Sequence, residues 1–414
     1  MAVTTDKRPA AGRPVDRPWL GQWNSAATSY YLLLGATSLL LIIGLVMVLS
    51  STTVTSIAAG DSPYTAGLEQ AKFAVIGLPL MLVAMRLPIR WYKGLAWPAL
   101  VTAVALQALT LVPALSRAEG SNAGWIHVAG ITLQPAEISK LALAVWLGAV
   151  LGRKQHLLGS WAHAFVPAVP GALLVLGLVL AGRDLGTMMV MAGLVAGALW
   201  VSGAPAKMLA LGGAIGAAAV VGLFVIGNSD RMGRILAVYE CSDRQGECYQ
   251  SLHGMYGLGT GGLFGVGLGA SREKWGLLPE AHNDFIFSII GEELGLLGTL
   301  TVLALFGVLG IAMARVVRRH PDPFVKITTA AVACWIVGQA FVNIGVVVGL
   351  LPVIGVPLPL VSAGGSALVA AMVALGMVMR FARDEPGAAE AFAARRGVLR
   401  RSMTVLGRSR RRAR

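Results

Sequence analysis

The sequence predicts an all-α polytopic membrane protein, because it is strongly apolar, poor in charge and interrupted at regular intervals by polar breaks. Apolar residues make up 56% of the 414 residues, Asp, Glu, Lys and Arg only 13%, and the mean hydropathy is +0.71. A soluble domain carries about 25% charged residues, so this chain lacks the charge that covers a water-facing surface. Glycine is abundant, as in closely packed or interrupted membrane helices. These features exclude a disordered, collagenous or disulfide-stapled secreted chain.

About ten segments are long and apolar enough to cross a bilayer as helices, which takes about 20 residues each. The first begins near Tyr30 behind a polar leader, so we expect an uncleaved anchor and not a secretory signal. Together the segments define a membrane domain over residues 31–381, between tails at 1–30 and 382–414. The expected spans are 31–50, 68–85, 94–115, 134–151, 165–181, 185–201, 208–226, 285–317, 324–351 and 360–379.

Lys and Arg collect in alternate connections, and this bias sets the orientation. Four lie in residues 1–30 and eleven of the 34 follow from Arg380 onward, whereas residues 51–67 and 352–359 have none. Both tails are therefore predicted to be cytoplasmic, and the net charge of +14 reflects topology and anionic lipid without any nucleic acid. Residues 227–284 carry five basic residues, but long translocated loops escape the charge rule, so a large extracytoplasmic loop is predicted there between spans seven and eight.

Several acidic residues gather where this loop joins the eighth span. Asp284 directly precedes the span, where partial desolvation raises a carboxyl pKa toward the range of a general base; the alternative is a helix N-cap. Glu280, His282 and Asp284 alternate as metal ligands do on an extended segment, but no second cluster accompanies them and no metal site is assigned. Glu292 and Glu293 lie further along, where a carboxylate needs either a function or a buried partner.

Basic residues on the same predicted side suit an anionic ligand. Pro135 fits the first position of the fourth span, and Lys140 beside that helix N-terminus suits a phosphate or pyrophosphate. The alternative is an internal ion pair, since Glu137 and Lys140 are three residues apart on one helix face. Arg231 and Arg234 follow the seventh span and suit bidentate phosphate binding, or else extend to the membrane interface.

The segment that follows the ninth span is expected to be irregular. Three prolines and a Gly-Gly pair stand between residues 349 and 366, so no single regular helix can form there. Irregular backbone at membrane depth is tolerated only against protein or a cavity, which predicts a broken helix beside a cleft. Asn343 and Ser362 flank this segment. The segment then either lines a lipid headgroup site or permits close packing.

The chain has only three cysteines. Cys241 and Cys248 lie in the outer loop, where an oxidising compartment favours a disulfide between them. Cys334 lies within a span and is expected to pack as a small apolar residue.

Taken together, these motifs resemble the SEDS family of bacterial cell-wall polymerases, the group of FtsW, RodA and SpoVE. The resemblance covers most of the membrane portion, in the family's order. Departures stand at Gly124, Ala136, Asn283 and Ala363, where the family more often has Arg, Ser, Thr and Tyr, and they concern substrate contacts more than activity. The matching stretches are Trp125 with Gln134-Pro135-Ala136-Glu137 and Lys140, Asp184-Leu185-Gly186-Thr187, residues 249–259, residues 279–295 and residues 343–366.

The resemblance implies a ten-span fold and a glycosyltransferase that polymerises lipid II at the outer face of the cytoplasmic membrane. Our mechanistic hypothesis is an inverting sugar transfer from a polyprenyl-pyrophosphate donor. It also implies a class B penicillin-binding protein as transpeptidase partner, with other division proteins at the septum. By position, Asp284 matches the family's essential acid, and Trp125 and Lys140 match its functionally sensitive Trp and Lys. No resident cofactor is predicted, although a divalent cation could share the neutralisation of pyrophosphate. The expected substrate-binding residues are Lys140, Trp125, Glu137, Arg231, Arg234, His282, Asn343 and Ser362.

Three other functions fit part of the sequence. A lipid II flippase would also use intramembrane charges and broken helices, but no inverted repeat is visible and the polar residues concentrate at one face. An elongation polymerase of the RodA kind would run the same reaction; the long basic tail favours division. A division scaffold, recruited through residues 382–414, is compatible with the enzyme.

Overall fold

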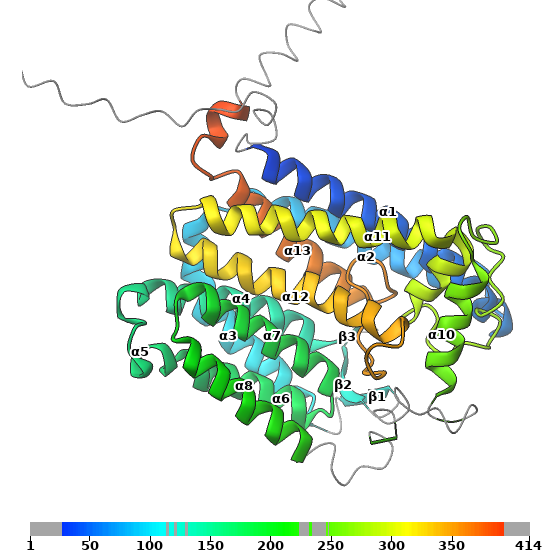
Figure 1. Ribbon diagram of the computed structural model, residues 1–414, viewed down its shortest axis with the longest axis horizontal. Helices are drawn as coiled ribbons and strands as arrows, with labels where there is room; N and C mark the ends of the chain where they lie inside the picture. The colour runs from blue at the N-terminus through cyan, green and yellow to red at the C-terminus, as the bar shows by residue number, and fades with distance from the viewer. Residues whose placement is uncertain are drawn as a thin grey trace, which may run out of the picture.

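The computed structural model is a bundle of apolar helices with a small β-sheet at one end (Figure 1). It describes residues 27–112, 116–119, 122–128, 131–222, 232–233, 246 and 248–392. The helices are α1 (Ala27–Ala58), α2 (Thr65–Ala84), α3 (Ile89–Leu109), α4 (Pro135–Arg153), the single 3-10 turn η1 (Gln155–Leu157), α5 (Trp161–Phe165), α6 (Ala168–Ala181), α7 (Leu185–Ser202), α8 (Ala206–Val220), α10 (Tyr249–Thr260), α11 (Ile286–Arg319), α12 (Pro323–Val347) and α13 (Gly365–Ala382).

Each predicted span falls on a helix. Eight segments of the described chain are long and apolar enough to cross a membrane, namely α1, α2, α4, α5 with α6, α7, α11, α12 and α13. The other two predicted spans fall on α3, which begins with Arg90 and Lys93 among its first residues, and on α8, which has 15 residues. The prediction of a helical membrane protein is confirmed, while the count of ten spans and their orientation stay predictions.

The centre of the bundle is formed by α4, whose side chains are buried almost continuously from Pro135 to Leu151. It packs against α3, α7 and α12, while α13 packs along α2 and α1 along α11. Small residues let these backbones approach. A Cβ placed on Gly148 of α4 would lie 2.0 Å from the hydroxyl of Thr328 on α12. Close helix contacts of this kind replace the hydrophobic drive that lipid does not supply.

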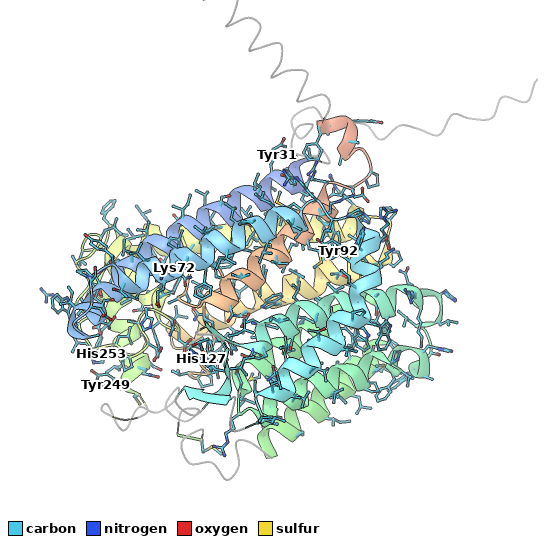
Figure 2. The ribbon with its side chains drawn as sticks, turned by 180° about the vertical axis from the view of Figure 1, so that it is seen from behind. Tyr31, Lys72, Tyr92, His127, Tyr249 and His253 are labelled. Atoms are coloured by element: carbon cyan, nitrogen blue, oxygen red, sulfur yellow. The ribbon has the colours of Figure 1, made fainter. Side chains whose placement is uncertain are left out.

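The irregular and β-structured connections that carry the candidate site lie at one end of the bundle. There the α10 helix, the sheet and the connection between α12 and α13 lie together, whereas the beginning of α1 and the end of α13 lie at the opposite end (Figure 1). Seen from behind, His127, Tyr249 and His253 mark the first end, and Tyr31 and Tyr92 lie toward the second (Figure 2). The first end is the one predicted to face outward, and we refer to it below as the outer end.

A three-stranded antiparallel sheet, which was not predicted from the sequence, occupies the connection between α3 and α4. Its strands are β1 (Ser116–Glu119), β2 (Asn122–Val128) and β3 (Ile131–Leu133), in the order β1-β2-β3, with Arg117 opposite Trp125 and Ile126 opposite Leu133. β-Branched and aromatic residues favour strands, but β1 and β3 are very short and β2 lacks a regular apolar–polar alternation. Trp125 is therefore held on a strand at the outer end.

The α11 helix is interrupted at Gly295, whose φ of 68° and ψ of −165° are outside the helical region. The outer loop fills the interruption. Val266 N–H donates to the carbonyl of Glu292 (2.9 Å), and Leu296 N–H donates to the carbonyl of Gly262 (2.9 Å). In an unbroken helix Leu296 would donate to Glu292 instead. The loop is thus joined to α11 by main-chain hydrogen bonds.

Candidate active site at the outer end

Asp284 lies in the turn that leads into α11, and its side chain is partly exposed. The helix cap is Phe285 and no side chain caps it, so the N-cap alternative for Asp284 is wrong. No group of the described residues forms a hydrogen bond or ion pair with its carboxylate. Burial, and then the negative charges of Glu280 and Asp184, raise the pKa of Asp284 from 3.8 to about 7. A carboxyl group with that pKa can accept a proton near neutral pH.

The main chain around Asp284 is held by two buried side chains. Asn343 on α12 donates to the carbonyl oxygens of Asp284 (2.7 Å) and Val356 (2.8 Å). Ser362 donates to the carbonyl of Asn283 (2.7 Å). Asn343 and Ser362 are only 1% and 6% exposed, and both were expected to bind substrate. Their contacts instead show that they position the Asp284 segment; a direct substrate contact by either stays a prediction.

A further residue, not predicted from the sequence, supports this arrangement from α2. The buried side chain of Gln70 donates to the carbonyl of Ser362 (3.2 Å) and accepts from the N–H of Gly364 (3.1 Å). A glutamine within an apolar helix is a signal that a distant main-chain group needs a partner. The irregular connection between α12 and α13 is thereby fixed on both sides. Within it, Gly355 has a φ of +69°, and a Cβ there would lie 3.6 Å from the carboxylate of Asp284.

Lys140 and Glu137 form a buried ion pair, which was the alternative to an anion site. The ammonium of Lys140 lies 2.7 Å from Glu137 and 3.1 Å from the side-chain oxygen of Gln339, and 5.0 Å from the ring centroid of Trp335. Lys140 is 1% exposed. A cavity of about 20 Å³ adjoins this group, which is room for about one water and far less than a lipid headgroup needs. Binding of pyrophosphate by Lys140, and of substrate by Glu137, stays a prediction.

The beginnings of three helices meet beside Asp284. Asp184 caps α7 by accepting from Thr187 N–H (2.9 Å), and it also accepts from the side chain of Gln134 (3.0 Å). The N–H of Gln134 donates to Ser366 at the beginning of α13 (3.3 Å). Asp184 is 6% exposed, and its charge adds to the raised pKa of Asp284. Gln134 and Asp184 are therefore part of the candidate site, although only the motif they belong to was noted from sequence.

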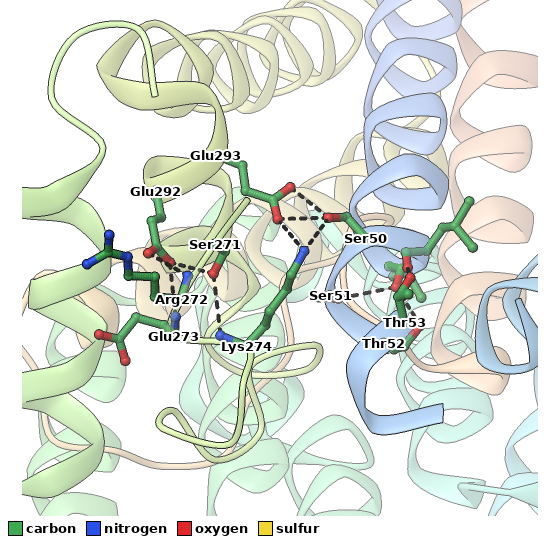
Figure 3. Close-up of polar contacts among 12 residues, drawn as sticks. Ser50, Ser51, Thr52, Thr53, Ser271, Arg272, Glu273, Lys274, Glu292 and Glu293 are labelled. Atoms are coloured by element: carbon green, nitrogen blue, oxygen red, sulfur yellow. Dashed lines mark hydrogen bonds and ion pairs between the residues drawn. The ribbon is translucent and has the colours of Figure 1, made fainter. Parts of the chain in front are cut away.

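Glu292 and Glu293 have the buried partners that the sequence left open (Figure 3). Glu293 accepts from the ammonium of Lys274 (2.9 Å) and from the hydroxyl of Ser50 at 2.7 Å. Glu292 accepts from the hydroxyl of Ser271 and from the main-chain N–H of Arg272 (2.8 Å). These carboxylates attach the outer loop to α11 and α1.

The remaining predicted site residues have mixed outcomes. His282 is partly exposed, and burial lowers its pKa against the opposing charge of Glu280. Trp125 is partly exposed on β2. Arg231, Arg234 and Cys241 lie outside the described residues. Phosphate binding by the two arginines and the pairing of Cys241 with Cys248 therefore stay predictions. Cys334, within α12, is a free thiol. No group of three acidic, His or Cys side chains suited to a metal occurs among the described residues.

The fold and the site define a polytopic helical membrane protein that carries a desolvated, unpaired carboxylate at one end of its bundle. The chain belongs to the FtsW, RodA and SpoVE family of cell cycle proteins, whose family model matches residues 30–386. The family predicted from the sequence motifs is thus confirmed.

Two named relatives match most of the chain. It is 37% identical over 392 residues to a Mycobacterium tuberculosis protein named "Probable peptidoglycan glycosyltransferase FtsW". The matched region covers 94% of this chain and 74% of that protein. It is 35% identical over 355 residues to stage V sporulation protein E of Bacillus subtilis, covering 85% of this chain and 96% of that one.

Solved structures share the fold. One, described as "Structural coordination of polymerization and crosslinking by a peptidoglycan synthase complex", matches with a TM-score of 0.69 and 27% identity over 86% of this chain and 97% of the other. The rod shape determining protein RodA of Thermus thermophilus matches with a TM-score of 0.62 and 27% identity, over 85% of this chain and 96% of that one.

Proposed function

We propose that this protein is a peptidoglycan glycosyltransferase that polymerises lipid II into glycan strands at the outer face of the cytoplasmic membrane, in septal wall synthesis. Membership of the family and the names of its relatives support the class of reaction. The observation that carries the proposal is the Asp284 carboxylate. It is fixed through its main chain, has no partner among the described residues and has a pKa raised to about 7.

The proposed reaction is an inverting sugar transfer in which Asp284 is the general base. Its carboxylate removes the proton from a sugar hydroxyl of the acceptor, and the oxygen attacks the anomeric carbon of the donor. The bond from that carbon to the pyrophosphate oxygen breaks, and polyprenyl pyrophosphate leaves with the bonding electrons. General base catalysis of this kind contributes roughly 100- to 10,000-fold.

The departing pyrophosphate needs positive charge. We assign this to Lys140, Arg231 and Arg234, with His282 and Trp125 beside the acceptor. Because Lys140 is paired with Glu137 in a closed environment, its participation requires that pair to open when substrate binds. Hydrogen bonds aimed at developing charge are among the largest contributions to catalysis. No step is assigned to a cation.

The proposed partner is a class B penicillin-binding protein, which would crosslink the strands that this protein makes. One of the matching solved structures is described as a peptidoglycan synthase complex that coordinates polymerisation and crosslinking. This description supports a crosslinking partner for the present chain. Lipid II as substrate and the other division proteins as partners follow from the same family relationship.

The test is glycan synthesis from purified lipid II by the full chain, with and without its transpeptidase. Asp284→Ala is expected to remove polymer while the helical circular dichroism and unfolding temperature stay unchanged. Full activity of a folded Asp284→Ala protein would refute the assignment of the base. Sealed vesicles provide the second arm, since a protein that moves labelled lipid II across the membrane without lengthening any glycan would be a flippase.

A further inference from the structure

A basic pocket lies at the end of the bundle opposite Asp284. It is an open cavity of about 460 Å³ lined by Met85, Arg86, Arg380 and Arg383. Arg86 follows the end of α2, whereas Arg380 and Arg383 lie at the end of α13. Three guanidinium groups from distant parts of the sequence therefore share one cavity, and no acidic residue lines it.

Close packing of α2 and α13 brings these groups together. The two helices lie against each other along their length. A Cβ placed on Gly376 would lie 2.6 Å from the carbonyl oxygen of Met81 and 3.2 Å from the Cβ of Ala84, so the two backbones are in contact at this level. Gly376 precedes Arg380 by one helical turn, and Ala84 precedes Arg86 by two residues. The position of the pocket is thus fixed by the helix contact.

Two of the three guanidinium groups have neighbours that position them, yet the positive charge is hardly neutralised by the described residues. Arg383 lies over the ring of Tyr30 at 5.8 Å and over that of Phe392 at 5.9 Å. Arg380 has one long ion pair, 3.4 Å to Asp384, whose side chain is 49% exposed. Arg86 makes no ion pair with any described residue. Like charges held this close repel one another, and a bound anion would remove that cost.

The surface beside the pocket is apolar. Leu78 and Leu82 precede Arg86 at four-residue intervals, so they lie on one face of α2, and they are 45% and 38% exposed. Leu82 stands one helical turn before Arg86, so this exposed apolar face of α2 ends next to the pocket residue. Arginine is suited to bidentate contact with phosphate, and basic pockets between membrane helices are sites for anionic lipid headgroups.

We propose that Arg86, Arg380 and Arg383 bind the phosphate of an anionic phospholipid in the leaflet at this end of the bundle, with its acyl chains along the Leu78–Leu82 face of α2. The general bias of basic residues toward the cytoplasmic side includes Arg380 and Arg383, but that bias alone does not bring three arginines into one cavity. Arg153 and Lys207 belong to that bias and are exposed elsewhere, outside the cavity. The site is independent of the catalytic role of Asp284.

The experiment is native mass spectrometry of the purified full chain titrated with dioleoylphosphatidylglycerol, with dioleoylphosphatidylcholine and with soluble glycerol phosphate. The wild type is expected to bind one phosphatidylglycerol at least 10-fold more tightly than phosphatidylcholine. The double variant Arg86→Gln/Arg383→Gln is expected to lose this preference. The charge-matched control Arg153→Gln/Lys207→Gln is expected to change it less than 2-fold. Where the Gln variant fails to fold, Arg86→Lys/Arg383→Lys replaces it, and a partial loss of preference is expected.

Three results would overturn the proposal. One is an unchanged preference in the folded Arg86/Arg383 variant. Another is an equal loss in the Arg153/Lys207 control, which would show attraction to diffuse charge only. The third is glycerol phosphate displacing the lipid at the same concentration as phosphatidylglycerol itself, which would show a site for free phosphate and not for lipid.

Discussion

Asp284 lies just before α11, and Glu292 and Glu293 lie within its first turns. The carboxylates of the two glutamates have partners, whereas that of Asp284 has none among the described residues. The carboxylate of Glu293 lies 2.9 Å from the ammonium of Lys274, and Glu292 accepts a main-chain N–H at 2.8 Å (Figure 3). Asp284 has its carbonyl oxygen held by Asn343 at 2.7 Å, while its carboxylate has no partner among the described residues.

This difference separates a structural acid from a chemical one. Carboxylates that accept hydrogen bonds from buried partners stabilise the contacts they make. A carboxylate fixed through its backbone and left without a partner keeps the ability to accept a proton. All three residues lie near the predicted outer boundary of the membrane. That position alone does not identify the catalytic group, because the presence or absence of a partner for the carboxylate also differs among them.

The largest effect is expected from Asp284→Asn, which removes the base without changing its shape. Glycan synthesis should fall at least about 100-fold. Because the raised pKa means that the folded state disfavours the charged carboxylate, the variant should unfold at an equal or higher temperature at pH 8. Asp61→Asn, on an exposed residue of the same end, is the control and should keep full activity. Full activity of the Asp284→Asn enzyme would show that Asp284 is not the base and that it differs from Glu292 and Glu293 only in its contacts.

Glu293→Leu should act on stability instead of chemistry. It leaves the ammonium of Lys274 buried without a counter-charge, which costs about 3–5 kcal/mol. Unfolding by denaturant in detergent measures this loss, and activity per folded molecule should fall far less than in Asp284→Asn. Adding Lys274→Met should recover most of the stability. If the Glu293→Leu protein has an unchanged free energy of unfolding but is as inactive as Asp284→Asn, Glu293 takes part in the reaction as well.

Asn343→Ala should have an intermediate effect on activity. The carbonyl of Asp284 loses its side-chain donor, and one hydrogen bond of about 1 kcal/mol corresponds to roughly a 5-fold change in rate. The loss should appear in kcat and not in KM, because Asn343 positions the base. Phe341→Ala, on the exposed face of the same helix, is the control. A change confined to KM would show instead that Asn343 contacts the substrate.

The smallest effect is expected from Glu280→Gln. Its charge raises the pKa of Asp284, so removing it lowers that pKa and keeps the base ionised to a lower pH. The acidic limb of the pH–rate profile should therefore move toward lower pH by a fraction of a unit. Glutamine keeps an oxygen for the side-chain N–H of Asn283, which now donates to Glu280 at 2.7 Å. Asp184→Asn should move the limb the same way but less, and movement to higher pH would contradict the account.

The helices were predictable because long apolar runs leave few alternatives to membrane helices. The limits of α3 were not, since its first turn carries Arg90, Trp91 and Lys93, and it begins at Ile89 and ends at Leu109 instead of covering 94–115. The sheet escaped prediction because β1 and β3 have only four and three residues, and the seven residues of β2 do not alternate regularly between apolar and polar.

The site was predictable in its residues more than in its contacts. Spacing along one helix anticipated the Glu137–Lys140 pair as the alternative to an anion site. The bonds from Asn343 and Ser362 to the Asp284 segment join positions 59 and 79 residues apart, and no local pattern encodes them. The structure shows that their donor groups hold the backbone, while a direct substrate contact by either residue stays a prediction.

The most direct test of Asp284 as the base is the rate of lipid II polymerisation by the wild-type protein as a function of pH from 5 to 9. With Asp284 as the base, the rate is expected to rise with pH and to reach half its maximum near the Asp284 pKa of about 7. A rate that does not change over this range, as for a carboxylate with an ordinary pKa of about 4, would contradict it.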